Sequence, residues 1–221
     1  MIDKGYSFYS QFGEDGILQY LIKILNLNNK ECCELGMTGT LFSNTYNLVE
    51  NYAWYGIYIE KEKNNLNNIK LGHHFNYEIK ESGEFSLDNI LKKTKINRNF
   101  DLLSIDIDNK DYHIWKSLKE YNPNIVIVEV NPFIDPKIEY VHNGTFFGSS
   151  FKSIVDLGNQ KGYTLVCMTG NLIFVKTILL ENTELEIFIK KNPIDLFLYD
   201  AIMVDKKQIS FKRYFKKDKL I

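Results

Sequence analysis

Acidic side chains follow several apolar stretches of this sequence, at positions where buried strands would end. Glu60 follows YGIYI, Asp106 and Asp108 end the segment DLLSIDID, and Glu129 lies in NIVIVEV. A carboxylate within a run of Val and Ile is costly to bury unless it has a partner or a task. Two carboxylates close together favour either a divalent cation or one raised pKa suited to general-base catalysis. These positions are therefore the first candidates for chemistry.

The side chains of Asp106 and Asp108 point to the same side if the strand continues through them. Glu129 then lies beside the pair if the two strands are neighbours. His142, in the loop after Glu129, is a further candidate base or substrate ligand. We expect Asp108, Glu129 and His142 to include the catalytic base and expect no metal. If a divalent cation binds, Asp106, Asp108 and Glu129 are its candidate ligands. The alternative is that the two aspartates only cap the next helix.

A glycine-containing turn, ELGMTG, follows the first expected strand. Glycine at Gly36 lets the backbone approach a bound cofactor without a side-chain clash. Glu60 follows at close to the spacing of about 20 residues at which a carboxylate commonly binds ribose hydroxyls. The turn lacks the G-x-G-x-x-G pattern of NAD-binding proteins, which counts against a dehydrogenase. Together these residues favour a ligand that contains a nucleoside.

The elements that would position these residues alternate between strands and helices. This rhythm predicts an α/β fold with a mostly parallel sheet and helices on both faces. Only Thr169-Gly170-Asn171 separates the last two strands, so that pair should be an antiparallel hairpin. The expected strands are 31–35, 55–60, 75–79, 101–106, 124–130, 163–168 and 172–176, and the expected helices are 15–25, 43–51, 86–93, 111–120 and 149–161. Seven strands of this kind resemble the Rossmann-like fold of class I methyltransferases.

Composition narrows the class of protein further. The 221 residues carry 27 Lys+Arg and 28 Asp+Glu, a balance unlike that of proteins that neutralise nucleic-acid phosphates. Three cysteines are too few for a disulfide framework, so we expect reduced thiols and a cytoplasmic location. No apolar run approaches the length of a membrane span. We expect one domain over 1–221, with a core at about 8–177 and an extension at 178–221 whose basic tail, QISFKRYFKKDK, forms a solvated helix or sheet edge.

Six motifs, in order along the chain, resemble one family. The segment SQFGEDG at 10–16 resembles the opening of FkbM-like S-adenosylmethionine-dependent methyltransferases. The other matching motifs are CELG at 33–36 with SNT at 43–45, SLDNIL at 86–91, LSIDID at 103–108, IVEVNP at 127–132 and GTFFGSS at 144–150. Two positions depart from the family pattern. Met37-Thr38-Gly39 replaces an acidic-Gly pair, and Asn109 stands where a glycine is common.

The resemblance implies a pocket for S-adenosylmethionine, with S-adenosylhomocysteine as the product. Glu34 and Gly36 would lie beside the amino-acid portion, and Glu60 would bind the ribose. Asp106 would close the pocket. Ser82 or Glu81 would approach the adenine, and Gln11 and Asn44 would supply polar contacts.

The implied reaction is O-methylation of a small-molecule acceptor, which we expect to be a sugar or phosphoryl-linked precursor of bacterial surface (capsule) polysaccharide. Positioning the acceptor oxygen in line supplies most of the rate, and a base supplies more. Two alternatives stay open. One is a metal-dependent nucleotide-sugar glycosyltransferase that uses the D-x-D motif at Asp106 and Asp108. The other is a non-catalytic ligand-binding domain of the same fold.

Overall fold

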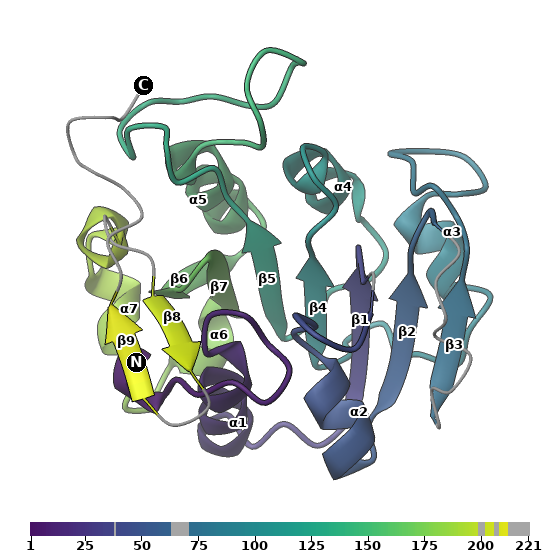
Figure 1. The fold of residues 1–221 in the computed structure, drawn as a ribbon, viewed down its shortest axis with the longest axis horizontal. Coiled ribbons are helices and arrows are strands. Elements are labelled where there is room, and N and C mark those ends of the chain that lie inside the picture. The colour runs from purple at the N-terminus through teal and green to yellow at the C-terminus, as the bar shows by residue number, and fades with distance from the viewer. Residues whose placement is uncertain (38, 63–70, 199–201, 206–207, 212–221) are drawn as a thin grey trace.

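The computed structural model describes residues 1–37, 39–62 and 71–198, together with the backbone of 202–205 and 208–211. A seven-stranded sheet forms its centre, in the order β3-β2-β1-β4-β5-β7-β6 (Figure 1). All neighbours pair in parallel except β7, which is antiparallel to both β5 and β6. The strands are β1 (Glu31–Leu35), β2 (Tyr55–Ile59), β3 (Gly72–Phe75), β4 (Leu102–Ile105), β5 (Ile125–Glu129), β6 (Tyr163–Met168) and β7 (Asn171–Lys176). This order and the antiparallel final pair confirm the class I methyltransferase-like fold.

Helices cover both faces of the sheet because the central strands are apolar on both sides. The side chain of Cys33 packs with α3, α4 and α5, whereas that of its neighbour Cys32 packs with α1 and α2 on the other face. Both thiols are fully buried, and burial raises their pKa well above the usual range. The helices are α1 (Glu14–Ile24), α2 (Tyr46–Tyr52), α3 (Leu87–Leu91), α4 (Asp111–Ser117), α5 (Phe151–Gln160), α6 (Thr177–Leu180) and α7 (Ile187–Lys190), with 3-10 turns η1 (Ile2–Lys4) and η2 (Pro193–Leu196).

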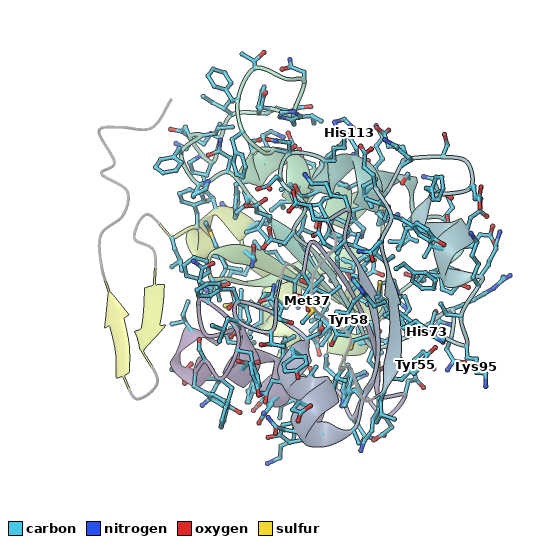
Figure 2. The ribbon with its side chains drawn as sticks, turned by 45° about the vertical axis from the view of Figure 1, so that its right-hand side comes forward. Met37, Tyr55, Tyr58, His73, Lys95 and His113 are labelled. Atoms are coloured by element: carbon cyan, nitrogen blue, oxygen red, sulfur yellow. The ribbon has the colours of Figure 1, made fainter. Side chains whose placement is uncertain are left out.

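The third strand lies earlier in the chain than the sequence indicates. β3 is Gly72–Phe75, not 75–79, and it contains His73 and His74, which read as loop residues in the sequence. Gly72 approaches Gly56 of β2 so closely that a Cβ would lie 1.9 Å from its carbonyl oxygen. His73 makes an edge-to-face contact with Tyr55, with 5.9 Å between ring centroids (Figure 2). An edge strand exposed on one side tolerates such polar residues, so its composition conceals it.

The segment after β7 packs back onto both faces of the sheet. Leu180 and Leu185 are buried with α1 and α2, whereas Phe197 is buried on the opposite face against Phe151. Beyond it, β8 (Ile202–Asp205) and β9 (Gln208–Phe211) form an antiparallel pair. The first four residues of the basic tail therefore form a strand, and the rest of that tail lies outside the described residues. None of the helices that the structure describes combines the length and apolar character that a bilayer span requires.

Candidate active site

Gly36 directly follows β1, at a point where the backbone is hydrogen-bonded to the chain on both sides. The amide of Gly36 donates a hydrogen bond to the carbonyl oxygen of Ile59 in β2 at 3.0 Å. On the other side, the amide of Asp106, the residue directly after β4, donates to the carbonyl oxygen of Leu35 at 3.2 Å. Gly36 has a φ of +88°, and a Cβ there would lie 1.5 Å from the carbonyl oxygen of Asp106. Only glycine fits this turn, because any side chain would collide with the backbone of β4.

A cavity of about 230 Å³ opens beside this turn, at the carboxyl ends of β1, β2 and β4. Ligands bind at this edge in open α/β sheets. Glu60 lines the cavity, is 7% exposed, and accepts a hydrogen bond from the amide of Glu62 through Oε1 at 2.9 Å. The apolar side chains of Ile59 and Ile79 and the ring of Tyr77 form the wall beside it. A carboxylate in this position can accept hydrogen bonds from ribose hydroxyls, and the apolar wall beside it can pack against an adenine ring.

A second cavity of about 210 Å³ lies on the other side of Asp106. Glu129 and Asn171, which are register partners on β5 and β7, line it from the sheet. Phe12 and Phe133 add aromatic surface. Asp106 lines both cavities, so its side chain stands at the junction between them. Two adjoining cavities that share one carboxylate can hold two reactants next to each other.

The carboxyl groups at this junction hold their protons more tightly than usual. Burial, followed by repulsion from Asp106, raises the pKa of Glu129 well above its usual range. Burial and neighbouring carboxylates, Asp111 first, likewise raise the pKa of Asp106. Oε2 of Glu129 is buried and has no hydrogen-bond partner among the described residues. Once it has lost its proton, a carboxylate with a raised pKa is a stronger base than usual and can take a proton from an acceptor hydroxyl.

A model of the FkbM methyltransferase domain matches residues 18–165, which is more than half of the chain. The chain belongs to this family. The match covers every residue that lines the first cavity and confirms the resemblance described above. No curated protein matches the chain at a significant level. Among solved structures, a chain described as a "putative hemolysin from Lactococcus lactis" shares 17% identity, with a TM-score of 0.46 over 72% of this chain and 85% of that chain. A likeness of that size carries no functional argument.

In this FkbM domain, Glu34 is committed to holding the loop before α2. Its carboxylate accepts hydrogen bonds from the hydroxyls of Ser43 and Thr45, both at 2.6 Å, and from the amides of Asn44 and Thr45. The side chain of Asn44 in turn donates to Oγ of Ser104 on β4 at 3.0 Å. Both residues are buried, and neither lines the first or the second cavity. They fix the loop that follows Gly36.

The turn after β4 separates the two aspartates. Asp106 faces the cavities, whereas Asp108 is exposed, has a φ of +54° and lines only the first cavity. Asn109 has a φ of +77° and accepts a hydrogen bond from the amide of Gly148 at 2.9 Å through its side chain. Asn tolerates this left-handed backbone better than most residues. It therefore replaces the family's glycine and also ties the turn to the loop after β5.

Of the remaining predicted site residues, one lines a cavity and the others do not. Gln11 lines the second cavity. His142 lies in the loop after β5, where its Nδ1 is 2.6 Å from the carbonyl oxygen of Phe146 and its own carbonyl oxygen is 2.9 Å from Nε2 of His113. Ser82 is exposed. Neither His142 nor Ser82 lines the first or the second cavity.

The sequence did not point to Tyr77 and Ile79, which line the first cavity. The reason is the early end of β3, which makes 77–79 the residues that follow the strand. Met37, expected in the cofactor turn, is instead 3% exposed and packs in the apolar cluster of α1 and α2 with Tyr58 (Figure 2). No grouping of His, Cys, Asp and Glu side chains suited to a metal ion occurs among the described residues.

Proposed function

We propose that this FkbM methyltransferase uses S-adenosylmethionine to methylate a hydroxyl group of a small acceptor. The supporting observation is the pair of cavities that meet at Asp106, one beside Gly36 and Glu60 and the other beside Glu129. The first cavity suits the cofactor, because Gly36 lines it without a side chain and Glu60 offers a carboxylate beside an apolar wall. When bound, S-adenosylmethionine supplies a methyl group already activated on a sulfonium sulfur.

Each residue of the site would have a separate role in binding or in proton transfer. Glu60 accepts hydrogen bonds from the ribose hydroxyls, and Ile79 and Tyr77 pack against the adenine. Asp106 orients groups at the junction of the cavities. Glu129 accepts the proton that the acceptor hydroxyl loses as its oxygen forms the new bond to carbon. Holding the acceptor oxygen close to the methyl carbon and in line with it supplies most of the acceleration.

The finer parts of the proposal rest on the family resemblance of the sequence. They are a sugar or phosphoryl-linked acceptor, a role in bacterial capsule polysaccharide, and a cytoplasmic location. The alternative of a nucleotide-sugar glycosyltransferase rests on Asp106 and Asp108, which line the same cavity. Under that alternative a divalent cation would bridge these aspartates and a sugar diphosphate.

Thermal unfolding with added ligands tests this proposal. S-adenosylhomocysteine should stabilise the protein by about 2.7 kcal/mol at 100 times its dissociation constant, which raises the Tm by roughly 5–10 °C for a chain of this size. UDP-glucose with Mn²⁺ should cause no comparable shift. A shift with UDP-glucose and Mn²⁺, and none with S-adenosylhomocysteine, would instead support the glycosyltransferase.

Replacing Glu60 should weaken S-adenosylhomocysteine binding selectively. Losing hydrogen bonds to a charged acceptor costs about 1.5–3 kcal/mol, so Glu60→Ala should raise the Kd about 10- to 150-fold. Glu84→Ala is the charge-matched control, because Glu84 is exposed and its carboxylate contacts only the surface residue Lys93 among the salt bridges described. Isothermal titration calorimetry gives both Kd values. Equal Kd values for the two variants would remove Glu60 from the binding site.

A further inference from the structure

The chain before α1 is held in one fixed path by a buried aspartate. Oδ2 of Asp15 accepts hydrogen bonds from the amides of Phe8, Tyr9 and Ser10 at 2.7, 2.8 and 3.0 Å, and from Oγ of Ser10 at 3.0 Å. Asp15 is only 2% exposed. Such a set of hydrogen bonds to one carboxylate oxygen fixes the backbone that leads to Phe12.

The neighbouring carboxylate, Glu14, connects this segment to the turn between β6 and β7. Glu14 is fully buried, and its Oε1 accepts a hydrogen bond from the hydroxyl of Thr169 at 2.6 Å. Its Oε2 accepts one from the amide of Phe12 at 2.8 Å. Thr169 lies in the turn between β6 and β7, so these two hydrogen bonds join the N-terminal segment to that turn. We call them the Glu14 clasp.

The ring of Phe12 packs directly on the backbone of the same turn. A Cβ on Gly170 would lie 2.1 Å from Cδ2 of Phe12, so the ring occupies the space that a side chain at 170 would need. Phe12, Thr169 and Gly170 all line the second cavity, on which Glu129 also opens. The clasp and the ring contact therefore build one continuous wall of that cavity.

This wall lies outside the part of the chain that matches the FkbM domain. That match ends at residue 165 and begins at residue 18, so it excludes Phe12, Thr169 and Gly170. The first cavity, by contrast, lies wholly within the match. The segment that the family model matches thus supplies the proposed cofactor site, and residues outside it supply much of the second cavity, although Phe12 and Glu14 belong to the SQFGEDG motif that resembles the family's opening.

We propose that Phe12 contacts the acceptor and sets which acceptors fit, and that Glu14 is a positioning residue that holds Phe12 in place through Thr169. The proposal deepens the proposed function and rests on it for the identity of the second cavity as the acceptor site. An aromatic ring gives a flat apolar surface on which a sugar ring or another apolar face can lie. Glu129 then faces the polar edge of the same molecule.

The clasp is tested first, without any acceptor. Thr169→Val keeps the side-chain shape and removes the hydroxyl, whereas the control Thr169→Ser keeps the hydroxyl. Amide hydrogen exchange across residues 8–13 should be at least tenfold faster in Thr169→Val than in the wild-type protein, and within twofold of wild type in Thr169→Ser. The Kd for S-adenosylhomocysteine should stay within twofold in both variants. Unchanged exchange in Thr169→Val would overturn the clasp.

The role of Phe12 is tested by binding of p-nitrophenyl α-D-glucopyranoside, a probe with sugar hydroxyls at one end and an aromatic ring at the other. Saturation-transfer NMR, recorded with S-adenosylhomocysteine present, should show that Phe12→Ala weakens probe binding at least fivefold, and Phe12→Tyr less than twofold. Thr169→Val should weaken it as Phe12→Ala does, whereas Thr169→Ser, which keeps the hydroxyl that Glu14 accepts from, should leave it within twofold of wild type. No probe binding to the wild-type protein, or equal binding to Phe12→Ala, would overturn the acceptor assignment.

These outcomes are separable from failure of the proposed function. If S-adenosylhomocysteine does not bind the wild-type protein, the methyl-donor assignment of the first cavity fails. The hydrogen-exchange comparison is then made on the protein alone and still decides whether the clasp exists. If S-adenosylhomocysteine binds and the probe results fail, only the role of Phe12 is lost.

Discussion

Gly36→Ala is expected to lower the Tm by roughly 5–15 °C and to abolish binding of S-adenosylhomocysteine. Two costs add at this position. A left-handed φ of +88° costs a residue with a Cβ about 1–2 kcal/mol. The new Cβ would also lie 1.5 Å from the carbonyl oxygen of Asp106, and relieving such a clash typically costs about 1–3 kcal/mol. The relief must move Gly36 and Asp106 apart, which distorts the cavity that both residues line.

Gly162→Ala is the matched control for this experiment. Gly162 also has a left-handed φ, +82°, but a Cβ there meets no atom within 4 Å. It lies in the turn before β6, outside the lining of both cavities as described. Gly162→Ala should therefore lose only the stability that the left-handed backbone costs, and its binding of S-adenosylhomocysteine should be unchanged. Thermal unfolding and calorimetric titration of the two variants separate the two costs. Similar Tm losses with intact binding in both would mean that the close approach at Gly36 does not shape the site.

The strands of the sheet interior could be predicted because they are buried on both faces. β1, β4 and β5 are near-continuous apolar runs, and the structure places each within one residue of the expected bounds. The sequence also indicated the hairpin of β6 and β7 through the short turn at Thr169 and Gly170. β3 could not be found in this way, because an edge strand with two histidines has no apolar run. That error of a few residues hid Tyr77 and Ile79, which line the first cavity after the true end of β3.

The identity of a polar residue did not reveal which partner it has. Glu34 has the residue type and position of a cofactor ligand, yet it is surrounded by hydroxyls and amides from 43–45. The Glu14 clasp joins residues that are 155 positions apart, and no local pattern encodes such a pairing. The motif around Glu14 was recognisable only as a resemblance, and its physical role became visible through the contact with Thr169. The residues that carry such contacts stand out in the sequence, whereas their partners become visible only in the fold.

The second large effect is expected at Glu129, the proposed base. Glu129→Gln keeps the shape of the side chain and cannot take up a proton, so kcat should fall about 10²- to 10⁴-fold. Because burial and Asp106 raise the pKa of Glu129, the wild-type group is mostly protonated at neutral pH. The wild-type kcat should therefore rise as the pH increases above neutrality, and the rise should be absent in Glu129→Gln. Release of S-adenosylhomocysteine, followed between pH 6 and 10 with a glycoside that supports turnover, gives both profiles. Asp108→Asn serves as the comparison, because Asp108 is exposed and does not line the second cavity.

The same group should make stability depend on pH, with a definite sign. A carboxyl whose pKa is higher in the folded state binds more protons when folded, so its contribution to stability is greatest at acid pH and is lost as the pH rises through the folded pKa. Each unit of the difference is about 1.4 kcal/mol, or roughly 3–6 °C in Tm for a chain of this size. Thermal unfolding without ligand should therefore show Glu129→Gln gaining stability relative to wild type between pH 6 and pH 10. If the two proteins keep a constant difference in Tm over this range, Glu129 titrates normally, and any rise of kcat with pH above neutrality must come from another group.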